Sequence, residues 1–356
     1  MAFWKALAFG FLVVFCHASR LVDHHHHHHD KAGVHALFVF GDSIVDPGNN
    51  NNLDTIAKAN HLPYGFKFKG HEASGRFCDG KLAVDLVAEH LGLPYPPPYS
   101  PNSSAATQGM NFGSATSGIL NSTGMVSLQF LITSEGSILS LSTQVNLFSH
   151  VAKGLPRDLI ASSIFYISTG NNDMASIEPM HTIISQFHAQ LEFISNFFCS
   201  LPQRLYDLGA RKFVVVGILN VGCVPATQLG DSCTELGEWM TKRFNEQLQT
   251  MLEEMRTSHQ GFTPIYANAA GIMDEVMRDP AAFGMSNVHQ GCCPSSSIIP
   301  FMFCYPGAFH CKDSSKYMFW DLVHPTEAFN TILVQRWYNG STEYVSPMNI
   351  AALAAA

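Results

Sequence analysis

Short apolar runs that alternate with longer amphipathic stretches constrain the fold of this chain more than any other feature. Residues 34–40, 163–167 and 212–216 are continuous apolar runs that each lead into glycine or small polar residues, and residues 263–267 form a weaker fourth. The amphipathic stretches between them include residues 186–207 and 234–256. Continuous apolar strands separated by helices are typical of a parallel sheet covered on both faces. We therefore expect a three-layer α/β/α domain over residues 34–345, with residues 346–356 as a C-terminal tail.

The N-terminus has the three parts of a secretory signal peptide. Lys5 is followed by an apolar run over residues 6–15, and a small-residue cleavage site is best placed after Ala18. The apolar run is too short for a bilayer-spanning helix, which needs about 20 residues. We predict a signal peptide over residues 1–18, no transmembrane segment and an exported, soluble mature protein, with the cell wall as one open destination.

Residues 24–29 are six consecutive histidines inside a linker that we assign to residues 19–33. The run is either an affinity tag behind the signal peptide or a natural metal-binding tract. In both cases it lies outside the predicted domain, and it enters no argument about the fold.

The composition favours a folded protein with no nucleic-acid partner. Apolar residues make up 46% of the chain and charged residues 13%, which is too hydrophobic for a disordered chain. The formal net charge is -8, and no basic stripe is visible that could neutralise phosphates. The oligomeric state cannot be derived from these features.

The cysteines of the mature chain favour disulfides. Cys16 leaves with the signal peptide, and the remaining eight are an even number in an exported chain. Cys223 and Cys233 close a short loop and are the pair we expect. A second compact loop contains Cys292, Cys293, Cys304 and Cys311, whose pairing the sequence leaves open. The alternative, a zinc site, is disfavoured because no C-x-x-C spacing occurs, so no metal is expected.

Three N-x-S/T triplets fit the same export route. They begin at Asn102, Asn121 and Asn339 and are candidate glycosylation sites.

A serine on the turn after the first predicted strand is the candidate nucleophile. Residues 41–46 read Gly-Asp-Ser-Ile-Val-Asp, and Gly41 allows a sharp turn that presents Ser43 at the carboxyl edge of the sheet. If a helix starts after Ser43, its N-terminal amides favour the negative charge that develops in acyl transfer. The alternative interpretation is an ordinary turn or helix cap.

Near the other end, Asp321 precedes His324 by three residues. A carboxylate at this spacing can accept the imidazole N–H and leave the other ring nitrogen to take the serine proton. The alternative is a surface pair at a helix start, with Asp321 as a simple cap.

Two further segments offer hydrogen-bond donors at the same edge. Residues 170–173 carry adjacent asparagines after the second strand, and residues 111–118 form a small-residue loop with accessible backbone amides. Donors aimed at a developing oxyanion contribute about 10²–10³ in rate each. Turn chemistry alone also favours these residue types.

Taken together, these segments resemble the SGNH, or GDSL-type, hydrolase superfamily and, within it, the plant GDSL esterase/lipase family. The resemblance runs from about Val34 to Trp337. It is carried by FVFGDSIVDPGNNN, SGRFCDGK, NFGSATSGIL, STGNNDM, the GCVP segment around Cys223 and WDLVHPTEA. It implies a flavodoxin-like sheet in one hydrolase domain.

The resemblance also implies roles for individual residues. Ser43 is the nucleophile, His324 the general base and Asp321 its orienting carboxylate. The oxyanion hole uses the Ser43 amide, the Asn172 side chain and the backbone amide at Ala115. Ala115 and Gly113 depart from the usual glycine and alanine of the family, which puts the size of the substrate in doubt more than the catalysis.

These residues predict an esterase or lipase that acts on a small-molecule or lipid ester without a cofactor. An acyltransferase with an alcohol or acid acceptor would use the same triad, and a non-catalytic binding protein of the same fold is the other alternative. The G-x-S-x-G elbow, the P-loop, G-x-G-x-x-G and H-E-x-x-H are absent from the sequence.

Overall fold

The computed structural model describes residues 33–101, 103–124, 138–175, 199–293 and 303–356. The predicted signal peptide, the histidine run and Asn102 lie outside the described residues. The other two candidate glycosylation sites, Asn121 and Asn339, are exposed, so their modification stays a prediction.

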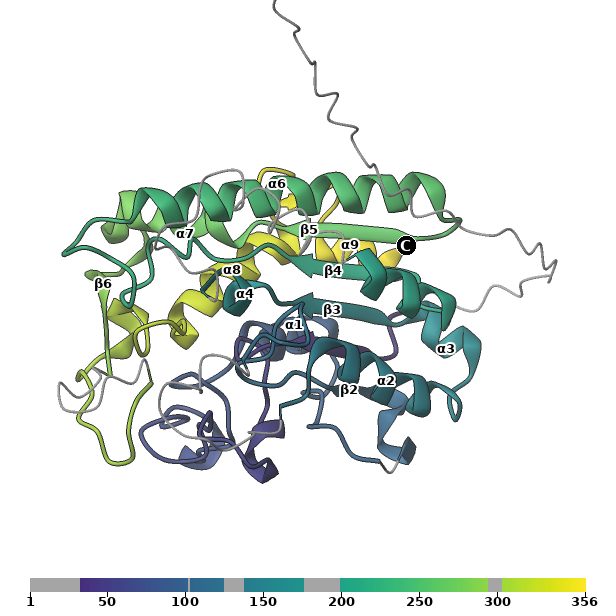
Figure 1. Cartoon of the computed structure of the whole chain (residues 1–356), viewed down its shortest axis with the longest axis horizontal. Helices are drawn as coiled ribbons and strands as arrows, with labels where there is room; N and C mark the ends of the chain where they lie inside the picture. The colour runs from purple at the N-terminus through teal and green to yellow at the C-terminus, as the bar shows by residue number, and fades with distance from the viewer. Residues whose placement is uncertain (1–32, 102, 125–137, 176–198, 294–302) are drawn as a thin grey trace, which may run out of the picture.

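A six-stranded sheet forms the middle of the molecule (Figure 1). Its order is β2-β1-β3-β4-β5-β8, and neighbouring strands are parallel except for β8, which joins β5 antiparallel. The flavodoxin-like order and the α/β class are confirmed. The strands are β1 (Leu37–Gly41), β2 (Gly109–Asn111), β3 (Ile164–Ser168), β4 (Lys212–Val216), β5 (Thr263–Ala267) and β8 (Val345–Ser346).

Alternate residues of each central strand enter opposite layers of the core, because side chains on a strand point to opposite faces. Phe38 and Phe40 pack with Phe148 of α2, whereas Leu37 and Val39 lie in a separate cluster on the other face. The first layer contains α2 (Leu141–Ala152), α3 (Arg157–Ser162) and α6 (Glu235–Ser258). The second contains α1 (Ala83–Leu91), α7 (Ala269–Arg278), α8 (Glu327–Asn339) and α9 (Ile350–Ala355). The three-layer prediction is therefore confirmed.

The shorter elements lie in the connections. They are α4 (Asn171–Ala175) and the 3₁₀ turns Asn49–Asn52, Lys69–His71, Ser103–Gln108, Pro280–Phe283 and Ser314–Lys316. A second, two-stranded parallel sheet joins β6 (Asn287–Gly291) to β7 (Tyr317–Phe319).

Two disulfides close the segment between β6 and β7. Cys292 pairs with Cys311 and Cys293 pairs with Cys304. The backbone amides of Cys292 and Cys293 donate to the carbonyls of Phe319 and Trp320, at 3.0 and 2.6 Å. These bonds dock the cross-linked segment onto the stretch of chain that leads to Asp321.

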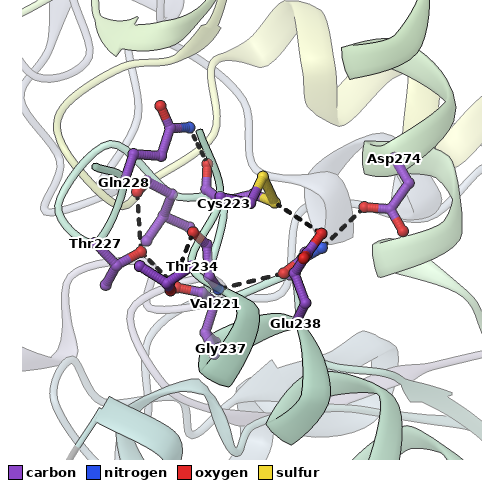
Figure 2. The surroundings of a disulfide bond; sticks show 12 residues. Val221, Cys223, Thr227, Gln228, Thr234, Gly237, Glu238 and Asp274 are labelled. Atoms are coloured by element: carbon purple, nitrogen blue, oxygen red, sulfur yellow. Dashed lines mark hydrogen bonds between the residues drawn. A yellow bond between two sulfur atoms is a disulfide. The ribbon is translucent and has the colours of Figure 1, made fainter. Parts of the chain in front are cut away.

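The predicted disulfide between Cys223 and Cys233 is present and closes the loop that precedes α6 in the chain (Figure 2). Glu238, in the first turn of α6, points toward the Cys223 sulfur. The Ala226 amide in this loop donates to the Leu322 carbonyl at 3.0 Å. The loop is thereby tied to the segment that carries Asp321 and His324. Cys78, by contrast, keeps a buried free thiol.

The structure corrects the predicted boundary of the domain at residue 345. That residue lies within β8, and the helix that follows buries Ile350 and Leu353 in the core. Residues 346–356 are therefore packed against the fold and are not a tail. The short strands β2, β6, β7 and β8 were not predicted. Within the described ranges, no helix is both long and apolar enough to cross a membrane.

Candidate active site

Ser43 lies two residues after the buried end of β1. Gly41 has φ 148°, and a Cβ on it would lie 1.9 Å from the Ser168 carbonyl oxygen, so only glycine fits where β1 meets β3. The buried Gln144 side chain accepts from the Gly41 amide at 2.8 Å and donates to the Gly41 carbonyl at 2.9 Å. The turn that presents Ser43 is therefore held from both sides.

The turn leaves the polar groups of Ser43 open. The amides on either side of it, those of Asp42 and Ile44, donate to the Ser168 carbonyl and to the Asp42 carboxylate. Within the described part of the chain, neither the amide nor the hydroxyl of Ser43 makes a hydrogen bond, although the residue is only 8% exposed. Both groups are available to a substrate.

Asp321 and His324 form a buried pair in the loop between β7 and α8. His324 Nδ1 lies 2.7 Å from Asp321 Oδ2, and both side chains are at most 3% exposed. A carboxylate can only accept, so Nδ1 carries the proton and Nε2 is left as the acceptor. Thr326 caps α8 by accepting from the Phe329 amide, and the Trp320 amide donates to the His324 carbonyl at 2.7 Å. The His324 loop is therefore fixed at both ends.

The nucleophile loop, the asparagine segment and the histidine loop meet at one place. Ile44, Asn171 and Pro325, each the chain neighbour of a predicted site residue, line one small cavity. His324 is also close enough that its protonated form lowers the pKa of the Asp42 carboxyl, next to Ser43. The ring of Phe77 lies against the His324 imidazole with centroids 4.9 Å apart. Segments almost 300 residues apart are thus brought to the carboxyl edge of the sheet.

The two other predicted oxyanion donors already make hydrogen bonds in this conformation. The Asn172 side chain, in the first turn of α4, donates to the Ser117 carbonyl at 2.8 Å. The single amide hydrogen of Ala115 is instead donated to Asp46 Oδ2 at 2.8 Å. In this conformation Ala115 has no hydrogen left for a substrate oxygen, so its predicted role stays a prediction.

Two buried carboxyls next to the nucleophile have raised pKa values. Burial raises the pKa of Asp42 to about 7, against the opposing effects of the Ile44 amide, the Asn171 side chain and His324. Its Oδ2 atom has no well-formed hydrogen bond among the described residues. Burial also raises the pKa of Asp46, to about 6, although its carboxylate accepts from the amides of Gly48, Asn49 and Ala115.

Comparison with known proteins identifies the family. The profile of the GDSL-like Lipase/Acylhydrolase family matches residues 37–337. GDSL esterase/lipase At1g29670 of Arabidopsis thaliana is 36% identical over 363 residues, covering 98% of this chain and 96% of that protein. GDSL esterase/lipase At1g71691 of the same plant is 34% identical, with 90% and 86% covered. The chain belongs to the GDSL esterase/lipase family. This GDSL enzyme is accordingly an ester hydrolase.

Several residues that build the GDSL site were not predicted from the sequence. Tyr64 donates to Asp321, Gln144 clamps Gly41, and Phe303 lies against His324 with ring centroids 5.5 Å apart. Only Asp46 lies inside a predicted motif, where a second aspartate three residues after the serine was a usable signal. Tyr64 and Gln144 act across 257 and 103 residues, separations at which no local pattern reveals a contact.

A metal site receives no support from the described residues. The one group of three close ligand atoms found there is Cys223, Cys233 and Glu238. Both sulfur atoms are joined in the disulfide, so neither is a thiolate that could bind an ion.

Proposed function

We propose that this GDSL enzyme is an exported serine esterase that uses Ser43, His324 and Asp321 as a catalytic triad. The observation that carries the proposal is the buried His324–Asp321 pair beside the loop that presents Ser43 with open polar groups. The pair holds Nε2 of the imidazole as a base, which is the function a serine nucleophile needs.

In the first half-reaction, Ser43 Oγ attacks the ester carbonyl while His324 takes its proton. Asp321 stabilises the imidazolium that forms. By the pattern of the family, the Ser43 amide and the Asn172 side chain donate to the tetrahedral oxyanion. His324 then protonates the leaving alcohol, and the acyl group stays on Ser43.

In the second half-reaction, His324 activates water, which releases the acid and regenerates Ser43. An alcohol or acid acceptor would follow the same route and give an acyltransferase. Nothing in the described residues selects such an acceptor over water, so we propose hydrolysis.

Export is supported by the signal-peptide pattern and by the cysteine chemistry. Among the described residues, disulfides join Cys223 to Cys233, Cys292 to Cys311 and Cys293 to Cys304. Such bonds persist in oxidising compartments and are rare in the cytosol.

Labelling with a fluorophosphonate, followed by peptide mass spectrometry, tests the proposal without a guess about the substrate. We expect one adduct on Ser43 that is lost in His324→Ala and kept in Ser149→Ala, a change on the surface of α2. Labelling that is unaffected by His324→Ala, or that falls on another serine, would refute the triad.

A further inference from the structure

The carboxylate of Asp321 is saturated with hydrogen bonds. Oδ1 accepts from the backbone amides of Val323 and His324, at 2.9 and 2.8 Å. Oδ2 accepts from His324 Nδ1 and from the hydroxyl of Tyr64, both at 2.7 Å. A carboxylate offers about four acceptor positions, so the carboxylate has no remaining capacity. Tyr64 is the one donor among these four that comes from a distant part of the chain.

The direction of the Tyr64 bond is determined by its second partner. The Cys304 amide donates to the Tyr64 hydroxyl oxygen at 3.0 Å, so the hydroxyl's own hydrogen is directed to Asp321. The ring is fully buried and packs against Phe77 and Trp320. Burial, reinforced by the charge of Asp321, raises the pKa of Tyr64 well above its usual value. The phenol therefore remains a donor throughout the range in which an esterase works.

The position of Tyr64 is in turn held by backbone contacts on both sides. The amide of the next residue, Gly65, donates to the Cys78 carbonyl at 2.9 Å. Cys304 is anchored by its disulfide to Cys293, whose amide donates to the Trp320 carbonyl, next to Asp321. The donor and the acceptor are thus attached to the same cross-linked segment.

We propose that Tyr64 is a positioning residue for the triad. Its hydroxyl orients the Asp321 carboxylate and weakens the hydrogen bond that this carboxylate accepts from the His324 imidazole. Because Tyr64 and His324 share Oδ2, each bond withdraws electron density from the oxygen that the other uses. Without the phenol, Oδ2 would be a stronger acceptor for the imidazolium and the carboxylate would be held by three donors. The effect of Tyr64 on catalysis rests on the proposed triad, whereas its effect on the protonation of the His324 imidazole does not.

Tyr64→Phe tests the proposal by removing one hydroxyl and keeping the ring. We expect kcat for a p-nitrophenyl ester to fall on the order of tenfold, with KM little changed. We also expect the acid limb of the pH–rate profile to move to higher pH. Within the described ranges, the other ionisable groups that interact with His324 are Asp321 and Asp42, and Tyr64→Phe leaves both in place. Tyr206→Phe is the matched control, because it loses a hydroxyl bond to the Gln260 carbonyl at the opposite edge of the sheet.

A purely structural role for Tyr64 predicts a different result. It would lower the melting temperature and the number of titratable active sites, but activity per active site and the pH midpoint would match those of the unmodified enzyme. That result would overturn the proposal.

An NMR titration of the His324 ring protons provides a readout that does not depend on activity. The resonances are assigned by their loss in His324→Ala, and we expect the midpoint to rise in Tyr64→Phe. Incorporation of 3-fluorotyrosine at position 64, a stronger donor, should shift the midpoint the opposite way. If the enzyme proves inactive but these shifts occur, the proposed function fails and the positioning role stands. Unmoved midpoints in both variants would refute the positioning role itself.

Discussion

The two halves of the site differ in how completely their hydrogen bonds are satisfied. In the base half, the Asp321 carboxylate accepts four hydrogen bonds, and His324 is packed against two aromatic rings. In the nucleophile half, the amide and hydroxyl of Ser43 make none within the described residues, and one oxygen of Asp42 is also left without a well-formed bond. The base half is complete before substrate arrives, whereas the nucleophile half has groups that a substrate could satisfy.

This difference implies that the two halves respond differently to mutation. A change in the open half removes a group that we propose the substrate uses, and it breaks few native bonds. A change in the closed half leaves buried donors without a partner, which costs stability as well as activity. Paired measurements of turnover and unfolding therefore separate the two.

The largest expected effect is that of Ser43→Ala. We expect kcat to fall about 10⁴–10⁶-fold, as for other serine nucleophiles. The free energy of unfolding should change by less than about 0.5 kcal/mol, because the hydroxyl has no native bond to lose. Ester hydrolysis and urea denaturation of the same preparation give both values. A large loss of stability would show that the nucleophile half is not open.

Asp321→Asn should lower kcat by about 10⁴-fold, because the amide cannot hold the same imidazole tautomer. It should also destabilise the protein by about 1–3 kcal/mol, since an amide group would face donors that now meet a carboxylate. The exposed Asp313→Asn is the control for the change of charge. If Asp321→Asn had the same free energy of unfolding as Ser43→Ala, the two halves of the site would not differ in stability.

Asn172→Ala should lower kcat by about 10²–10³-fold with a small change in KM, as expected for an oxyanion donor. The lost bond to the Ser117 carbonyl makes a modest loss of stability the accompanying effect. Asn172→Asp, which has similar size but no amide donor, should be at least as impaired. Wild-type turnover in Asn172→Asp would exclude a donor role for this side chain.

Asp42→Asn should change how stability depends on pH. The pKa of Asp42 is raised on folding from 3.8 to about 7, so the folded state binds the proton more tightly. The resulting stabilisation is complete below about pH 4 and is lost as pH rises through 7. An asparagine at this position does not titrate. We therefore expect the free energy of unfolding to fall less in the variant than in the wild type between pH 4 and 8, by a difference on the order of 2–4 kcal/mol.

Urea unfolding at intervals of half a pH unit measures this difference. Asp46 is unchanged in the Asp42→Asn variant, so the difference between the curves reports Asp42 together with its interaction with His324. Parallel curves for the two proteins would contradict the raised pKa.

The sequence by itself determined the α/β class, the flavodoxin-like parallel sheet, the family and the Cys223–Cys233 disulfide. Each of these depends on local information: apolar runs that match β1, β3, β4 and β5, ordered motifs and a short loop closure. The location of Ser43 and Asn172 at one sheet edge followed from the same reasoning, because parallel strands end together. His324 follows no strand of this sheet, and only the resemblance to the family implied that it joins Ser43. Their catalytic roles stay predictions.

Only the tertiary structure decided which polar groups are already occupied. Asp46 takes the Ala115 amide across 69 residues, Gln144 holds Gly41 across 103, and Tyr64 reaches Asp321 across 257. The sequence also could not show that residues after 345 pack into the core. The physical reason is that a hydrogen bond joins two atoms of defined position, and at these separations the positions are determined by the packing of the whole fold.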